Sequence, residues 1–498
     1  MLNAYTNQRQ PRPILLRTPR LARLSVWIAW LAGLGAMALL LALAPLTWGV
    51  LVVCGATGTI FLLLHPETGL YLLAFTIPFG SLYPLTLGSV TLDMSDILVM
   101  VIALGWFLRL TSSRREHLVG GRLALSLGCF LLTLLLALFP AENMTEAFKE
   151  LAKWVEFLLI LLFITNEQGA VKLDLLLTAL LLAGTLQGLL GIFQFLRGSG
   201  PIAFAFLGRY IRSYGTFGQP NPFGGYMGLL LPLAYSTVFL RWRQALPGRM
   251  GSPLHESVLW WLALLASGVM LTALLMSGSR GALLGLVAGI LAVILVTGKR
   301  VWPLLALLVV GIIALGPTLI TFVPGAYLAR ITDIFQFATL SNLTTIEITD
   351  TNFAVIERAA HWLAAWRMFS LHPWLGVGLG QYATVYPLVA IPRWADPLGH
   401  AHNYLLNILA EGGLVACTGY LVFMFTVLVS SIRVALSKLA WQRSLGLAAV
   451  GMWTALFVHN LFDNLYVHGM YLLVAIVFGM IAALTLPQPN LTPPEEAK

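Results

Sequence analysis

Two short segments of the chain pair an arginine with residues that commonly begin a helix. They are Arg212 with Pro220-Asn221-Pro222, and Ser279-Arg280-Gly281-Ala282. Asn221 and Ser279 can each cap the helix that follows, because their side chains accept hydrogen bonds from backbone N–H groups. A helix N-terminus carries about half a positive charge, and an arginine adds a planar fork of donors. The pattern predicts a site for a strongly anionic group, with Arg209 as a further cation; anchoring of the arginines to lipid phosphates is the alternative.

A third segment, Gly399-His400-Ala401-His402-Asn403-Tyr404, supplies candidate bases. Asn403 is a plausible helix cap, so His402 stands at a helix start, where a neutral histidine can accept a proton from a hydroxyl. Zinc would need further ligands, and neither an HExxH motif nor an acidic pair accompanies the two histidines. We therefore expect no metal, with His402 as the base and His400 as its substitute. The alternative is that His402 only caps or packs the end of its helix.

The composition indicates what kind of fold must position these residues. Of the 498 residues, 59% are hydrophobic and only 10% are charged, and the mean hydropathy is +0.86. Soluble domains carry roughly 25% charged residues, so the chain is not a soluble globular protein. Apolar runs long enough to cross a bilayer recur along it, and we expect an all-α, polytopic membrane protein with about 12–14 transmembrane helices. The runs are 25–46, 47–64, 69–88, 95–110, 122–139, 151–165, 173–196, 222–240, 257–276, 281–298, 301–322, 403–431, 444–462 and 469–486.

The basic residues predict the orientation. Placing the N-terminus inside puts most of the 29 Lys and Arg residues on the cytoplasmic side, as the positive-inside rule requires. Both termini are then cytoplasmic, and the helices starting near 222, 281 and 403 all begin on the outer face. Two polar segments also fall outside, 197–221 and 323–402. Within the second, the spacing of Trp362 and Trp366 predicts a helix over 352–369, which would form a small lid on the membrane surface.

The same patterns divide the chain into four regions. We expect a cytoplasmic basic arm over 1–24, N-terminal transmembrane helices over 25–196, a catalytic transmembrane region over 197–486 that includes the extracytoplasmic loop 323–402, and a cytoplasmic tail over 487–498.

Three weaker patterns accompany the main segments. Gly376-Val377-Gly378-Leu379-Gly380 mimics a nucleotide loop, but no strand precedes it, and it is interpreted as a flexible turn. Glu411 lies nine residues after His402, on the opposite face of a straight helix, and is expected to organise packing. His459 and Asp463, four residues apart, are a candidate supporting pair for the site or simply polar residues at a helix end.

The motifs together resemble the O-antigen ligase and polymerase superfamily, membrane glycosyltransferases of the GT-C type. The resemblance covers 173–486, while the first third of the chain shows no matching motif. It rests on Arg212 with Pro220-Asn221-Pro222, Ser279-Arg280-Gly281-Ala282, His372-Pro373-Trp374-Leu375-Gly376-Val377-Gly378, and His402-Asn403-Tyr404-Leu405 followed by Glu411-Gly412-Gly413. It implies transfer of a glycan from undecaprenyl pyrophosphate to an acceptor sugar hydroxyl, such as that of lipid A–core, outside the cytoplasmic (inner) membrane. Polymerases that extend the glycan and enzymes that glycosylate proteins share the pattern.

The residues themselves favour an inverting, metal-independent transfer. A pyrophosphate leaving group needs charge stabilisation rather than a general acid, and arginines at helix starts supply it. We expect catalysis by His402, Arg280 and Arg212, with substrate contacts from Arg209, Asn221, Ser279, His400 and Asn403. No cofactor is implied; the expected partners are the lipid-linked donor, a glycolipid or glycan acceptor and the bilayer, and no nucleic acid. A transporter of lipid-linked glycans or small molecules is the main alternative, although transporters usually place polar groups at the midplane, and only Glu156 and Glu411 look deep.

Overall fold

The computed structural model describes residues 46–88, 90–113, 118–206, 210–245, 254–298, 348 and 352–486. Within these ranges the chain forms fourteen α-helices and two short antiparallel hairpins, which confirms the all-α, polytopic prediction. The basic arm, Arg209, the apolar run 301–322 and the tail over 487–498 lie outside the described residues.

The chain divides into two compact units, residues 1–62 and 63–498. Helix α2 (Leu46–Leu64) covers the described part of the first unit and ends at the boundary. All residues of the site belong to the second unit, which is described from here on.

The first half of the second unit consists of apolar helices with conventional ends. Asn143 caps α6, since its side chain accepts a hydrogen bond from the backbone N–H of Glu146, and Gly198 ends α7 in the left-handed conformation. The elements are α3 (Pro66–Phe79), η1 (Gly80–Leu82), β1 (Leu85–Leu87), β2 (Val90–Leu92), α4 (Met94–Ser113), α5 (Gly121–Leu136), α6 (Met144–Asn166) and α7 (Leu173–Arg197). Strands β1 and β2 pair antiparallel, with Leu85 opposite Leu92.

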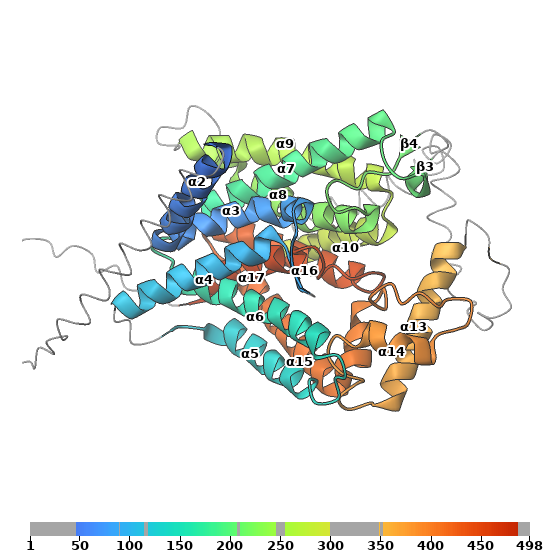
Figure 1. The fold of residues 1–498 in the computed structure, drawn as a ribbon. Helices are drawn as coiled ribbons and strands as arrows, with labels where there is room; N and C mark the ends of the chain where they lie inside the picture. Colours follow the sequence, from blue (N-terminus) through green and yellow to red (C-terminus); the bar gives the residue numbers. More distant parts are fainter. Residues whose placement is uncertain are drawn as a thin grey trace, which may run out of the picture. The chain divides into compact units, whose positions relative to one another are not determined.

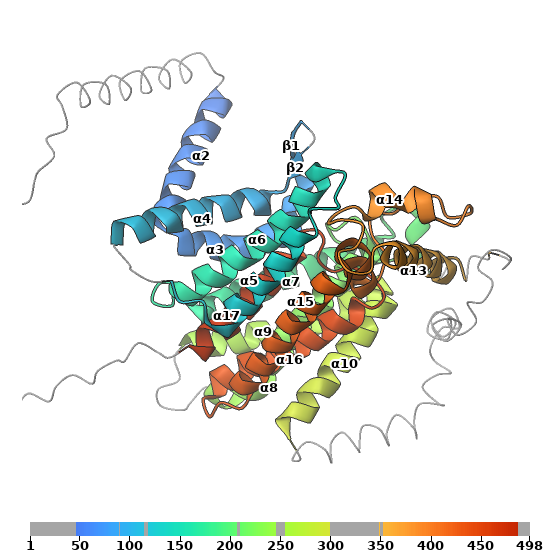
Figure 2. The ribbon, with the colours of Figure 1, turned by 90° about the horizontal axis from the view of Figure 1, so that it is seen from below.

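The second half builds the bundle that carries the predicted site segments (Figure 1). Its elements are η2 (Ile202–Phe204), β3 (Ala205–Phe206), β4 (Tyr210–Ile211), α8 (Pro220–Ala245), α9 (Leu254–Ser277), α10 (Arg280–Thr297), α13 (Phe353–Leu371), α14 (Tyr382–Val389), α15 (Tyr404–Ala435), α16 (Ala440–His459) and α17 (Met470–Thr485). Helix α8 packs against α9 and α16, and α10 packs against α16 and α8. Helices α13 and α14, from the long polar segment, contact each other and α15 at one end of the bundle (Figure 2).

Six of the described helices are long and apolar enough to cross a membrane by length and composition. They are α4, α7, α8, α9, α10 and α15, and α5 and α17 are shorter apolar helices. Each of these eight helices coincides with an apolar run predicted from the sequence, so hydropathy predicted their positions correctly. The total number of membrane spans, about 12–14, stays a prediction.

Helix α15 is broken at Gly413, whose φ is 62°. The glycine-rich loop that follows His372 occupies the break: the Gly378 N–H donates to the Glu411 carbonyl at 3.0 Å, and the Leu414 N–H donates to the Pro373 carbonyl at 2.8 Å. The Glu411 carboxylate in turn accepts the Tyr382 N–H at 3.0 Å, which is the packing role predicted for it. The loop is a turn, as expected, but these backbone bonds hold it against α15, so its interpretation as flexible was wrong.

Replacing Gly413 by alanine should destabilise the protein by about 2 kcal/mol or more, because a side chain is strained at this φ. An added Cβ would also lie 2.3 Å from the Trp374 carbonyl oxygen. The measurement is the apparent melting temperature of the purified protein in detergent. Gly128→Ala is the control, since a Cβ there meets nothing within 4 Å; equal melting temperatures for the two variants would contradict the prediction.

Candidate functional site

A cavity of about 90 Å³ opens where α8 and α10 begin. It brings together side chains from five parts of the chain: the loop before α8, the first turn of α8, the start of α10, helix α13 and the loop after α16. The residues that matter below are Arg212, Asn221, Ser279, Arg280, Arg358 and Asp463. Three guanidinium groups around one small cavity favour an anion with several oxygen atoms.

Arg212 is held in place by two hydrogen bonds. Its Nε donates to the Ser277 carbonyl at 2.6 Å, at the end of α9, and its Nη2 donates to Asn221 Oδ1 at 3.0 Å. Helix α8 begins at Pro220, so Asn221 lies in the first turn and does not cap the helix as predicted. A proline suits the first helical position because it lacks the N–H that would need a partner. The Asn221 side chain instead accepts the hydrogen bond from Arg212.

The start of α10 also lines the cavity. Ser279 caps this helix as predicted, with Oγ accepting the Ala282 N–H at 3.4 Å. Arg280 is the first residue of the helix and lines the cavity. His459 packs directly on this turn, because a Cβ on Gly281 would lie 2.9 Å from its ring. Only glycine lets α16 approach the helix start this closely.

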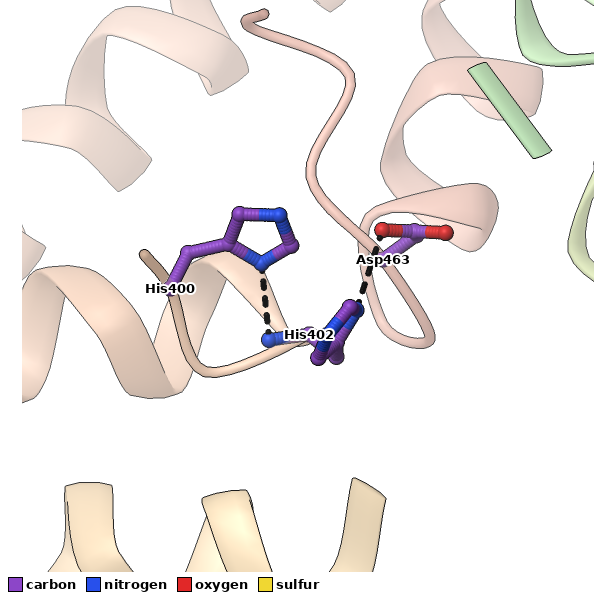
Figure 3. A group of neighbouring side chains, drawn as sticks. All are labelled: His400, His402 and Asp463. Carbon is purple, nitrogen blue, oxygen red and sulfur yellow. Dashed lines mark hydrogen bonds and ion pairs between the residues drawn. The ribbon is translucent and has the colours of Figure 1, made fainter. Parts of the chain in front are cut away.

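His402 and Asp463 form a hydrogen-bonded pair (Figure 3), with His402 Nδ1 lying 3.3 Å from Asp463 Oδ1. Burial alone would raise the pKa of Asp463, but the bond with His402 and the charge of Arg358 lower it overall. An ionised carboxylate at Nδ1 keeps the proton on that nitrogen and leaves the lone pair on Nε2. Nε2 is buried and has no hydrogen-bond partner within the described part of the chain. An imidazole held in this way is suited to accept a proton.

The backbone of His402 is also constrained. Its φ is 50°, a left-handed conformation that costs a non-glycine residue about 1 kcal/mol or more. The N–H donates to His400 Nδ1 at 3.1 Å, and the carbonyl accepts from Trp362 Nε1 at 3.2 Å. Asn403 caps α15 as predicted, accepting the Leu406 N–H at 3.1 Å. These contacts hold an unfavourable conformation, as is common at active sites.

Two further histidines surround His402 and stay neutral. Burial and the nearby His402 lower the pKa of His400 to about 3 and that of His361 to about 4. His400 is already engaged through Nδ1, and His361 Nδ1 lies 3.0 Å from the Tyr382 hydroxyl. The geometry therefore makes His400 an acceptor that positions the His402 backbone.

His400, His402 and Asp463 are also the described residues whose donor atoms come closest to a metal-binding arrangement, lying within 4.8 Å of one another. Two histidines and a carboxylate are a possible ligand set for zinc. In the structure, the His402 backbone N–H donates to His400 Nδ1, and the His402 side chain pairs with Asp463.

The sequence predicted that the starts of three helices lie together at one site. The first turns of two of them, α8 and α10, line the cavity. Helix α15 differs, because the N–H of its first residue, Tyr404, donates to the Asn460 carbonyl at 2.7 Å. Its N-terminus is thus used to attach the loop after α16, the loop that carries Asp463.

Sequence reasoning missed Arg358 and the partner of His402. Arg358 lies on α13 one turn before Trp362, so the helical pattern that singled out the two tryptophans also placed this arginine on the same face. Asp463 was paired with His459, its neighbour in sequence, whereas its side chain contacts His402.

A comparison with known protein families gives a match to part of the chain. Residues 265–421 match a family model described as O-antigen ligase, which confirms the resemblance over that segment. The matched residues include Arg280, Arg358 and His402, whereas Arg212 and Asp463 lie outside them. No curated protein matches the chain.

The lowered pKa values of the buried histidines predict how the stability of the protein depends on pH. Because the pKa of His400 in the folded protein, about 3, lies below its ordinary value of 6.5, the unfolded chain binds its proton first as the pH falls. The stability contributed by neutral His400 is therefore complete above pH 6.5 and is lost progressively below it. The apparent melting temperature should fall between pH 7 and pH 4.5.

The variant His400→Asn should reduce this slope, since asparagine keeps an acceptor for the His402 N–H but does not titrate. His372→Asn, at an exposed position outside the cluster, is the control and should keep the wild-type slope. If His400→Asn kept that slope as well, His400 would not be the group responsible.

Proposed function

We propose that this O-antigen ligase-like membrane protein transfers a glycan from undecaprenyl pyrophosphate to an acceptor sugar hydroxyl, with lipid A–core as the acceptor. The reaction takes place on the outer, periplasmic face of the cytoplasmic membrane, and both termini lie in the cytoplasm. The observation that carries the proposal is that Asp463, the hydrogen-bonded partner of His402, lines a cavity together with Arg212, Arg280 and Arg358. This arrangement supports the assignment of a base next to a site for a polyanion.

The donor pyrophosphate occupies the arginine-lined cavity. Guanidinium groups bind phosphate oxygens in pairs, and the N-terminus of α10 adds a partial positive charge. Arg212 is fixed by Ser277 and Asn221, so little conformational freedom is lost when the donor binds.

The acceptor hydroxyl gives its proton to His402 Nε2 while its oxygen attacks the anomeric carbon of the donor sugar. The bond between that carbon and the phosphate oxygen breaks, and the pyrophosphate leaves with the electron pair. The arginines stabilise the negative charge that develops on the leaving group, and Asp463 stabilises the protonated His402. A single displacement of this kind inverts the anomeric centre.

Reconstitution in liposomes with a purified undecaprenyl-pyrophosphate glycan tests the proposal. Lipid A–core and a second lipid-linked glycan are offered in separate reactions, and the products are separated by mass. We expect glycan-modified lipid A–core. A product ladder on undecaprenyl pyrophosphate would instead identify a polymerase, and movement of the donor across the membrane without transfer would identify a transporter.

In this assay His402→Gln should lose transfer by about 10²–10⁴-fold, the usual contribution of a positioned acid–base group. Glutamine keeps hydrogen-bonding capacity but is not basic, and donor binding by the arginines should persist. His372→Gln, outside the site, should transfer normally. Substantial activity in His402→Gln would mean that the histidine only caps or packs the start of α15.

Arg280→Lys should also be severely impaired, although the charge is kept. Lysine lacks the planar fork that holds two phosphate oxygens, so we expect a rise in the donor KM together with a fall in kcat. The folded state is checked by melting temperature. Wild-type kinetics in Arg280→Lys would show that the arginine is only an anchor at the membrane interface.

A further inference from the structure

Helix α13 donates hydrogen bonds to the backbone at both members of the His402–Asp463 pair. Arg358 Nε donates to the Phe462 carbonyl at 3.0 Å, immediately before Asp463. Trp362 Nε1 donates to the His402 carbonyl at 3.2 Å. Arg358 and Trp362 are four residues apart in a regular helix, so they share one face. A displacement of α13 would therefore disturb both members of the His402–Asp463 pair at once.

Arg358 also faces the cavity. Its side chain is half-buried and lines the cavity together with Arg280. Nε is used by Phe462 and Nη1 donates to the Ala354 carbonyl at 3.1 Å, whereas Nη2 makes no hydrogen bond with the described residues. One guanidinium group thus attaches α13 to the loop of Asp463 and keeps a donor for an anion in the cavity.

We propose that α13 couples donor binding to the alignment of the base, with Arg358 as a third ligand of the donor pyrophosphate and Trp362 as a positioning residue for His402. The proposal rests on the proposed function. The bonds from α13 to Phe462 and His402 are already formed in the structure, so a pyrophosphate that binds Arg358 holds α13 in this arrangement and keeps the pair aligned. The base is therefore held most firmly when the donor is in place.

Helix α13 also contributes a side chain next to the base: the ring centre of His361 lies 5.6 Å from that of His402. A ligand shifts a conformational equilibrium only through contacts that differ between its states. The contact of Arg358 with the donor is the one that favours the arrangement in which α13 holds the pair.

Two variants separate the two roles, and α13 offers a matched control for each. Arg358→Gln removes the charge facing the cavity, with Arg367→Gln as its control, because Arg367 is exposed and donates to the Val389 carbonyl instead. Trp362→Phe removes the indole N–H and keeps an aromatic ring, with Trp366→Phe as its control, because Trp366 is 53% exposed.

Arg358→Gln should weaken donor binding by about tenfold or more, as expected for loss of a charge-assisted hydrogen bond, and should also lower kcat at saturating donor. Trp362→Phe should bind the donor as the wild type does but lose kcat severalfold. Donor binding and kinetics are measured with the same undecaprenyl-pyrophosphate glycan. Both control variants should behave as the wild type.

Hydrogen exchange tests the coupling directly. Saturating donor should slow the exchange of α13 amides in the wild type and not in Arg358→Gln. If the donor leaves α13 exchange unchanged in the wild type, or if Arg358→Gln binds donor normally, the inference is overturned. Arg280→Gln is measured in parallel: loss of donor binding in that variant together with normal binding in Arg358→Gln refutes the inference alone, whereas absence of donor binding by the wild type refutes the proposed function itself.

Discussion

The hydrogen bond between the His402 ring and the Asp463 carboxylate is the contact on which the rest of the site depends. The two residues are 61 positions apart, at the start of α15 and in the loop after α16, so the bond exists only when these helices are packed. The packing is itself secured at this point, since Tyr404 donates to Asn460 in the same loop. The chain thus uses the start of α15 to attach the loop that carries Asp463, the partner of the His402 ring.

The cationic cavity lies next to that pair. Arg212, Arg280 and Arg358 line it together with Asp463, whose pKa is lowered despite its burial by the bond with His402 and by the charge of Arg358, so that the carboxylate stays ionised. Under the proposed function, an anionic donor in this cavity brings further negative charge into the same small volume.

Local patterns predicted the parts of the site that depend on local physics. Ser279 and Asn403 cap their helices because capping involves only the next three residues. Asn221 did not follow this rule, since Pro220 begins α8 and the Asn221 side chain contacts Arg212 instead. Arg358 and Phe462 are 104 positions apart, and no spacing within one helix reveals such a contact. The helices follow from hydropathy, whereas the pairing of side chains follows from how the helices pack.

The break in α15 at Gly413 separates the segment that carries His402 from the rest of that long helix. Helices adjust to bilayers of different thickness by tilting, and a continuous helix transmits this tilt along its whole length. Here the segment of α15 before the break, Tyr404–Gly412, is held by hydrogen bonds to the loop around Gly378 and to Tyr382. We expect the break at Gly413 to absorb changes in the tilt of the segment that follows it. The geometry around His402 then stays the same when the bilayer thickness changes.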